Sequence, residues 1–185
     1  MKQILLMIAV VMGQSMLAAD KKPLTKEESA KFIEAVIRRS LNKPTGELTK
    51  AGLEKVTMLN LDFKQLTNVK GLEKLTQLKG LNLADNQITD LSALETLTQL
   101  KYLRLSDNQL TDVKGLEKLT QLKYLNLEDN QLTDVKGLEK LTQLNELNLK
   151  NKFLFLDGNP VLTKAQIAEL QKALPKCDIY SNAKK

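Results

Sequence analysis

Leucines and polar residues alternate along the chain in a pattern that recurs every 22 residues. Gap-free rows begin at Val56, Leu78, Leu100 and Leu122, and a fifth row begins at Leu144. In the row from Leu122, Leu125 and Leu127 alternate with Tyr124, Asn126 and Glu128, so a short strand buries the leucines and presents the other three side chains on its opposite face. One such coil cannot bury its leucines alone. The pattern therefore predicts stacked coils whose strands form a parallel sheet.

An asparagine recurs where each predicted strand turns inward, at Asn86, Asn108 and Asn130. Backbone groups buried in such a turn need hydrogen-bond partners, and an amide side chain both donates and accepts. These asparagines form a column that resembles a binding site. We interpret them as structural residues that satisfy the backbone inside the turns.

The row from Leu122 begins with L-x-x-L-x-L-x-x-N, and its turn N-Q-L-T-D-V (Asn130 to Val135, matched by Asn108 to Val113) leads into G-L-E-K-L-T-Q-L. This motif resembles leucine-rich-repeat proteins of the 22-residue class, most closely bacterial internalin-like domains, over roughly Val56 to Asn159. The resemblance implies an α/β solenoid with a curved parallel sheet on its concave face and 3₁₀ or irregular turns on its convex face. It also implies that the concave face recognises a protein partner.

Helical caps are expected at both ends of the solenoid, because its terminal coils need cover. Thr25 to Glu28 resembles a capping box that opens a helix, whose apolar residues recur at helical spacing up to Leu41. A short second helix is expected after Thr49. At the other end, Thr163 is expected to cap a helix from about Lys164 to Leu174, followed by a short strand over Cys177 to Tyr180.

The fifth row is irregular. Leu144 is followed by two segments that both suit the sheet, Glu146–Lys150 and Phe153–Asp157, and removing Asn145 to Asn151 restores the repeat with Asn159 in the asparagine position. The seven extra residues are an odd number, so one continuous strand cannot turn both pairs of apolar residues inward without a bulge. The sequence leaves open which segment forms the strand.

The first 19 residues have the layout of a secretory signal peptide, with Lys2, an apolar run from Ile4 to Met12 and small residues at Ala18 and Ala19. A membrane anchor would need about 20 apolar residues. We therefore divide the chain into a signal peptide (1–19), a helical N-terminal cap (20–55), about five repeats (56–159) and a C-terminal helical cap (160–185). We expect a secreted or periplasmic protein that does not span a membrane after cleavage.

Composition excludes most chemistry. The chain has no histidine, which removes His-dependent proton transfer, Ser-His-Asp catalysis and most zinc sites. No glycine-rich phosphate loop occurs, and the repeated Asp-Asn pairs lack the oxygen spacing of a calcium loop. We expect no enzyme activity, cofactor, metal site or nucleic-acid partner. The net charge is +6, with lysine and glutamate interleaved, and the single cysteine, Cys177, is expected to be a small core residue.

Two rows of the chain suggest where a partner binds. The rows from Leu100 and Leu122 differ at only two of 22 positions, Arg104/Asn126 and Ser106/Glu128, and both positions project from the strand away from the leucines. The exposed back of the coil has not diverged, so we interpret the difference as a sign of a binding surface. The candidate contact residues on the concave face are Met58, Asn60, Asn82, Tyr102, Arg104, Ser106, Tyr124, Asn126 and Glu128. Phe153 and Phe155 extend the patch if the second segment forms the strand.

Three functions suit this reading. The first is a monomeric module that binds a protein outside the cytoplasm, because tyrosine and arginine dominate interface energetics. The second is a binder of a cell-envelope polysaccharide, in which Tyr102 and Tyr124 lie against sugar rings. The third is a structural spacer without a specific ligand.

Overall fold

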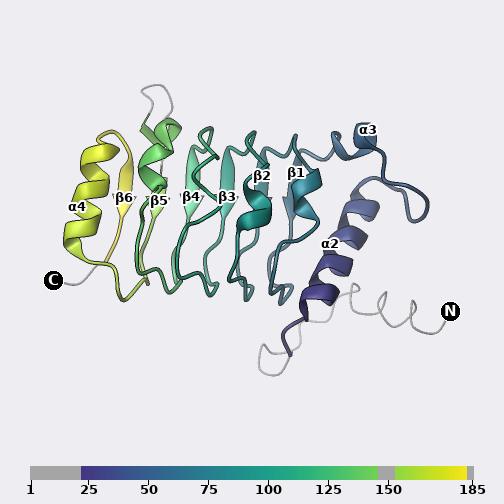
Figure 1. The fold of residues 1–185 in the computed structure, drawn as a ribbon, viewed down its shortest axis with the longest axis horizontal. Helices are drawn as coiled ribbons and strands as arrows, with labels where there is room; N and C mark the ends of the chain where they lie inside the picture. Colours follow the sequence, from purple (N-terminus) through teal and green to yellow (C-terminus); the bar gives the residue numbers. More distant parts are fainter. Residues whose placement is uncertain (1–21, 146–152, 183–185) are drawn as a thin grey trace.

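The computed structural model describes residues 22–145 and 153–182, and within them six parallel strands form one sheet in the order β1 to β6 (Figure 1). The strands are β1 (Met58–Asn60), β2 (Gly80–Asn82), β3 (Tyr102–Arg104), β4 (Tyr124–Asn126), β5 (Phe153–Phe155) and β6 (Asp178–Tyr180). Their central residues pair in register from Leu59 through Leu125 to Ile179. The predicted parallel sheet is confirmed, and β6 extends it by one strand.

Leucine side chains fill the interior of every coil. In the coil of β4, Leu122, Leu125, Leu127, Leu138 and Leu141 all have no exposed surface. Burying a leucine side chain contributes about 1.5–3 kcal/mol, so repeated leucines supply most of the stabilisation in a chain with few aromatic residues. Short 3₁₀ helices close the side opposite the sheet, as the resemblance implied: η1 (Leu72–Lys74), η2 (Ser92–Leu94), η3 (Leu138–Lys140) and η4 (Thr142–Asn145).

Helices cover the two ends of the solenoid. Helix α2 (Lys26–Ser40) and the short α3 (Lys50–Leu53) lie at the β1 end, and α4 (Lys164–Ala173) lies at the β6 end (Figure 1). Thr25 and Thr163 each form a capping box, with Glu28 and Gln166 respectively. Ile33, Ile37 and Leu53 bury their side chains against the first coil, and Leu170, Leu174 and Cys177 do so at the far end.

No helix within residues 22–145 and 153–182 is long and apolar enough to cross a membrane. The expected signal peptide lies outside the described residues.

Buried asparagines connect successive coils, as predicted. The Asn108 Oδ1 accepts a hydrogen bond from the Ile88 N–H at 3.0 Å, and its Nδ2 donates to the carbonyls of Leu83, Leu105 and Ser106. Asn86, Asn130 and Asn159 make equivalent bonds. In the first coil Lys64 stands at this position, and the Asn86 Oδ1 accepts from the Lys64 and Leu66 N–H groups. The asparagine column is therefore an internal structural ladder.

The second of the two competing segments forms the fifth strand. Phe153, Leu154 and Phe155 pair with Tyr124, Leu125 and Asn126 of β4. Leu154 and Leu156 are fully buried, and Asn159 joins the asparagine ladder. The alternative strand, Glu146–Lys150, lies outside the described residues.

Candidate functional site

The first and third residues of β1 to β4, and the third residues of β5 and β6, lie on the side of the sheet away from the leucine core, which we call the exposed sheet face. Parallel register brings equivalent residues of successive coils side by side, because each strand pairs with the next without a shift. The first positions of β1 to β4 are Met58, Gly80, Tyr102 and Tyr124, and the third positions of β1 to β6 are Asn60, Asn82, Arg104, Asn126, Phe155 and Tyr180. The predicted candidate residues from β1 to β4 thus share one surface.

A shallow groove of about 660 Å³ lies over β1 to β4 on this face. It is lined by Met58, Leu59, Asn60, Gly80, Leu81, Asn82, Tyr102, Arg104 and Tyr124. The Met58 side chain lies over Gly80 at the β1 end of the groove, and Met58 and Tyr102 are 65% and 51% exposed. Two large side chains that are more than half exposed are available for contact with a partner.

Aromatic side chains continue the exposed sheet face from β4 to β6. The rings of Phe155 and Tyr180 stack with centroids 4.9 Å apart and planes 13° apart, and Tyr124 meets Phe155 at 5.7 Å in a tilted arrangement. The guanidinium of Arg104 lies 6.0 Å from the centre of the Tyr124 ring, at the outer limit of a cation–π contact. Arg104 therefore joins the groove to the aromatic row, which consists of Tyr124, Phe155 and Tyr180.

Asn126 differs from the other candidate residues. Its side chain is only 7% exposed, and its Nδ2 donates to the Glu128 carboxylate at 2.6 Å while its Oδ1 accepts from the Glu128 N–H. It holds Glu128 in place and offers a partner little surface. The neighbouring candidates Ser106 and Glu128 are half-buried at the end of the strands.

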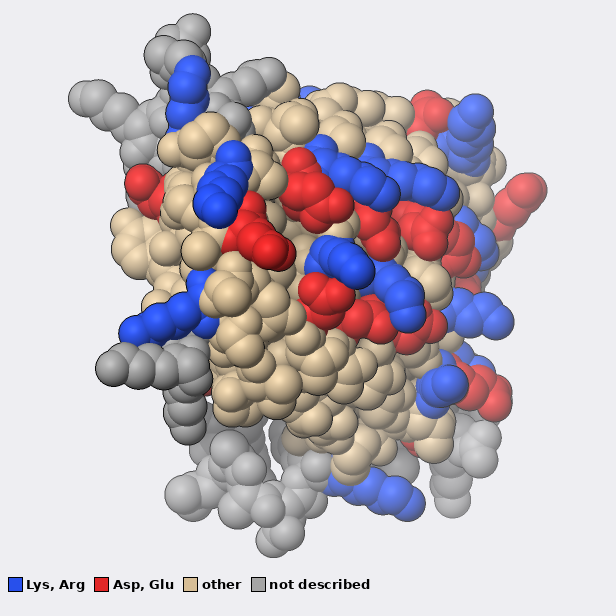
Figure 2. Space-filling model, turned by 60° about the vertical axis from the view of Figure 1, so that its left-hand side comes forward, with Lys and Arg blue, Asp and Glu red and all other residues tan. Residues whose placement is uncertain are grey.

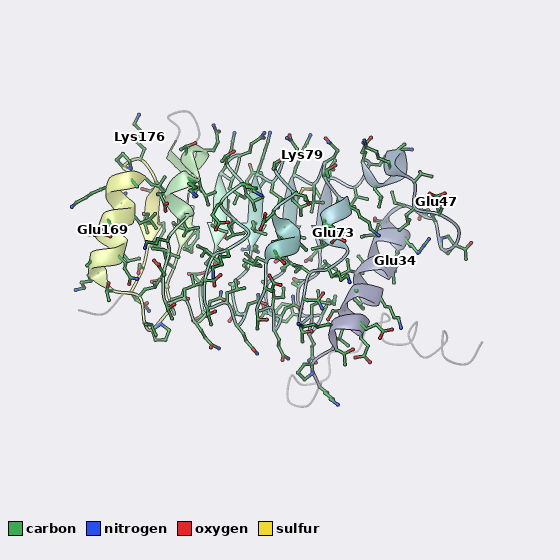
Figure 3. The ribbon with its side chains drawn as sticks, in the orientation of Figure 1. Glu34, Glu47, Glu73, Lys79, Glu169 and Lys176 are labelled. Atoms are coloured by element: carbon green, nitrogen blue, oxygen red, sulfur yellow. The ribbon has the colours of Figure 1, made fainter. Side chains whose placement is uncertain are left out.

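Charged residues of opposite sign border the face at the two ends of the strands. Lys79, Lys101 and Lys123 precede β2, β3 and β4, and we call them the lysine column; each lysine N–H donates to the preceding coil, as from Lys101 to the Lys79 carbonyl at 2.8 Å. Figure 3 shows Lys79 at one edge of the row of coils. This column was not among the predicted site residues, although the same position in three rows of the repeat carries lysine.

The opposite border is the aspartate column, Asp85, Asp107 and Asp129. Each follows a strand and has a left-handed φ of 54°, 55° and 49° respectively, a conformation that aspartate and asparagine tolerate better than most residues. Burial, followed by the nearby charges of Asp107 and Asp62, raises the pKa of the Asp85 carboxyl above its ordinary value. The column therefore concentrates negative charge.

Two further exposed residues, Tyr180 and Phe63, were not among the predicted contact residues. Tyr180 shares its column with Arg104 and Phe155, and the predicted strand over Cys177 to Tyr180 would have placed it there by alternation. Phe63, 68% exposed, has a left-handed φ of 55° at the row position where the next three coils carry aspartate. A 22-residue alignment shows that substitution, but not the backbone conformation.

The described residues hold no group of three His, Cys, Asp or Glu side chains that could bind a metal ion. Cys177 is buried, as expected for a core residue. The exposed sheet face offers a groove, aromatic rings and charged borders.

Comparison with known proteins identifies the repeat. Residues 54–110 match the family model "Leucine rich repeat", and residues 98–139 and 120–163 match "Leucine Rich repeats (2 copies)". These matches together span more than half of the chain. The chain belongs to the leucine-rich-repeat family. No curated protein sequence matches it.

Two solved structures resemble this leucine-rich-repeat protein. An internalin (InlF) of Listeria monocytogenes is 30% identical over 74% of this chain, with a TM-score of 0.63. A leucine-rich-repeat protein of Leptospira interrogans is 32% identical over 72% of this chain, with a TM-score of 0.60. The match covers 38% and 33% of those two chains, so this protein spans little more than a third of their length. It resembles bacterial internalins in fold and sequence.

Proposed function

We propose that this leucine-rich-repeat protein binds another protein through its exposed sheet face, and does so outside the cytoplasm. The observation that carries the proposal is the groove of about 660 Å³ between Met58, Tyr102 and Arg104, continuous with the aromatic row. Repeat scaffolds of this family commonly serve as binding surfaces, and the similarity to an internalin supports that role here.

The residue types on the face suit a protein partner. Tyrosine and arginine are enriched among the residues that dominate interface energies, and methionine adapts to irregular apolar surfaces. Tyr102 combines a half-exposed ring with a position at the groove wall, and Arg104 keeps its guanidinium exposed beside it. Six strands about 4.8 Å apart give a face roughly 24 Å long, which suits a modest interface.

The experiment is a pull-down with purified protein and a double variant, Tyr102→Ala/Tyr124→Ala. The expected result is stoichiometric capture of a protein that the variant no longer retains. The matched control, Lys74→Ala/Lys140→Ala, changes exposed residues of η1 and η3 and should capture the partner normally. Equal capture by the wild type and the tyrosine variant would contradict the proposal. Retention of envelope polysaccharide that is lost in high salt would favour the polysaccharide alternative.

Export is the second part of the proposal, and it rests on the signal-peptide layout of residues 1–19. Protein recovered from outside the cytoplasm should begin at Ala19 or Asp20. N-terminal sequencing that finds Met1 on the exported protein would overturn this part.

A further inference from the structure

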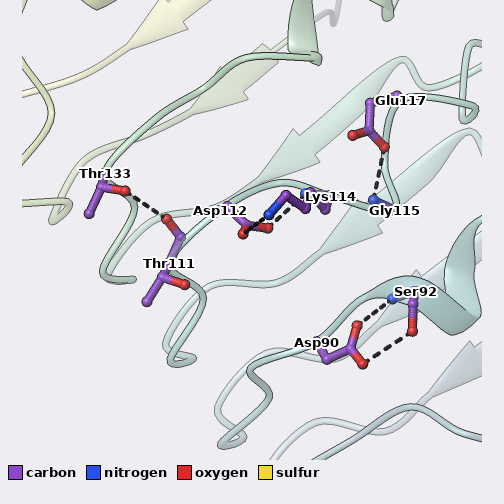
Figure 4. Close-up of polar contacts among 8 residues, drawn as sticks. All are labelled: Asp90, Ser92, Thr111, Asp112, Lys114, Gly115, Glu117 and Thr133. Atoms are coloured by element: carbon purple, nitrogen blue, oxygen red, sulfur yellow. Dashed lines mark hydrogen bonds and ion pairs between the residues drawn. The ribbon is translucent and has the colours of Figure 1, made fainter.

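Charge is arranged differently on the two sides of the coils. One face carries basic and acidic side chains in adjacent rows (Figure 2). In the turns that lead away from the sheet, Lys114 pairs with Asp112 at 3.2 Å (Figure 4), and Lys118 pairs with Glu95 of the preceding coil at 2.8 Å. Lys114 and Lys118 are therefore each compensated by a carboxylate within the molecule.

The borders of the exposed sheet face lack such compensation. Within residues 22–145 and 153–182, no member of the lysine column or the aspartate column forms a salt bridge. Asp85 follows Lys79 by six positions, so the two columns lie about 15–20 Å apart across the strands, beyond the screening length of roughly 8 Å at physiological salt. The face therefore has a positive border and a negative border with the groove between them.

Backbone hydrogen bonds hold each column in line. The Lys123 N–H donates to the Lys101 carbonyl at 2.9 Å. On the other border, the Asp85 and Asp107 N–H groups donate to the carbonyls of Ser106 and Glu128, each at 3.0 Å. Successive charges are fixed one coil apart, so the borders run parallel to the stack of coils and perpendicular to the strands.

Resting on the proposed function, we propose that the partner binds through a protein segment that lies between the two columns, perpendicular to the strands. Its acidic side chains face the lysine column, and its basic side chains face the aspartate column. An α-helix is about 10–12 Å wide, so it fits between the columns. The columns cover three coils, about 10 Å along the stack, and a helix of about 16 residues, about 24 Å long, reaches over the whole sheet. Apolar side chains on its underside meet Met58 and Tyr102 in the groove.

Phe63 fits the same arrangement. Its N–H donates to the Ala84 carbonyl, next to Asp85, so the exposed ring stands at the end of the aspartate column. A ring beside carboxylates suits a lysine or arginine side chain, whose cation is attracted by both and whose methylene groups pack on the ring. This border therefore matches the basic side of the segment.

The aspartate column also discriminates between partner classes. An anionic polysaccharide would be attracted by Lys79, Lys101 and Lys123 and repelled by Asp85, Asp107 and Asp129 on the same face. Like charges placed opposite each other weaken binding and suppress wrong partners. A protein segment with acidic side chains on one side and basic side chains on the other is repelled by neither column, so the structure favours a protein.

The test uses two synthetic 18-residue helical peptides of identical composition. One carries glutamates along one side and lysines along the other, and the second has the same residues interspersed. Fluorescence anisotropy with the purified full chain should show about tenfold tighter binding of the segregated peptide, since several charge pairs of modest strength add up. Equal affinities for the two peptides would overturn the proposal.

Column variants assign the effect to the two borders. Lys79→Glu/Lys101→Glu/Lys123→Glu and Asp85→Asn/Asp107→Asn/Asp129→Asn should each weaken the segregated peptide about tenfold. The control Lys74→Glu/Lys136→Glu/Lys140→Glu makes the same charge change as the first variant on the opposite side, and should leave the affinity within about twofold. An equal loss in the control would overturn the proposal. Thermal melts verify that each variant is folded.

Other occupants give distinct results that also count against the proposal. Polyglutamate that binds more tightly than the segregated peptide, and tighter still to the aspartate variant, would identify a groove for anionic polymers. A dimer in sedimentation that the column variants dissociate would make the occupant a second copy of this chain. If the pull-down partner is lost with Tyr102→Ala/Tyr124→Ala but retained by both column variants, the proposed function stands and this inference fails.

Discussion

Met58 covers Gly80 on the exposed sheet face. A Cβ added to Gly80 would lie 2.5 Å from both the Sδ and the Cε of Met58, closer than side-chain atoms approach in folded proteins. The thioether therefore occupies the space above the glycine, and the two residues together shape the end of the groove that lies at β1. Met58 has several rotatable bonds, so it can move away when that space is taken.

This contact predicts that Gly80→Ala alters binding and leaves folding almost unchanged. Gly80 is not among the residues with positive φ, and the clashing atoms are at the flexible end of a side chain, so the free energy of unfolding should change by less than about 0.5 kcal/mol. The displaced Met58 should lower partner capture in the pull-down. A urea melt checks stability, and unaltered capture would show that this end of the groove is not used.

Asn108→Ala tests the asparagine ladder. The change removes one acceptor and the donors to three carbonyls in a turn where Asn108 is buried, and should cost about 1–3 kcal/mol. Lys114→Ala is the control. It loses only an exposed ion pair with Asp112 and should cost less than about 0.5 kcal/mol. Equal shifts of the urea midpoint would refute the structural role of the ladder.

Asp85→Asn should stabilise the protein at neutral pH. Because burial and the neighbouring aspartates raise the folded-state pKa of Asp85, its ionised form opposes folding, and this penalty is fully present above the folded-state pKa. The penalty shrinks as the pH falls through that pKa and is absent below the unfolded value of about 3.9, where both states bind the proton.

Urea melts between pH 7 and pH 3 measure this dependence. The advantage of Asp85→Asn over the wild type should decrease towards low pH, leaving only a pH-independent offset from asparagine at a left-handed φ. Asp178→Asn, at an exposed residue of β6, supplies the control. An advantage that is constant over the whole range would show that burial and the neighbouring aspartates do not raise the folded-state pKa of Asp85.

Deleting Asn145 to Asn151 should leave a folded protein at least as stable as the parent. Leu144 would then be followed directly by Lys152 and Phe153, as Leu122 is followed by Lys123 and Tyr124, and β5 would keep its register with β4. The C-terminal cap would rest on a coil of regular length. A clear fall in the urea midpoint would instead show that Leu147 and Leu149 contribute buried surface, because two lost leucines cost several kcal/mol.

Features that depend on residues within one row could be predicted from the sequence. The alternation around Leu125 predicted a strand, and the recurrence of Asn108 and Asn130 predicted an internal ladder. The capping boxes at Thr25 and Thr163 are local too, since both partners lie within four residues. Stacking identical units repeats each local result, which is why the register of the sheet followed as well.

Features that depend on contacts between different rows could not be predicted. Phe153–Phe155 and Glu146–Lys150 have the same alternation, and only packing against β4 and the position of Asn159 distinguish them. The cover of Gly80 by Met58 joins two rows and depends on a rotamer. The lysine and aspartate columns could be seen in the repeat. That their members form no salt bridges within the described residues could be found only from the three-dimensional structure.

The hydrogen bonds of the asparagines run in one direction along the stack. Asn86 accepts from Leu66, Asn108 from Ile88, Asn130 from Leu110 and Asn159 from Leu132, so each coil completes the backbone of the coil before it. A 22-residue unit copied into the interior would carry an asparagine that accepts a hydrogen bond from the buried N–H of the preceding coil. Its own buried N–H would donate to the asparagine of the following coil. The molecule can thus lengthen or shorten by whole units without stranding a buried donor, a route by which gene duplication changes the size of the binding face while every new junction is already satisfied.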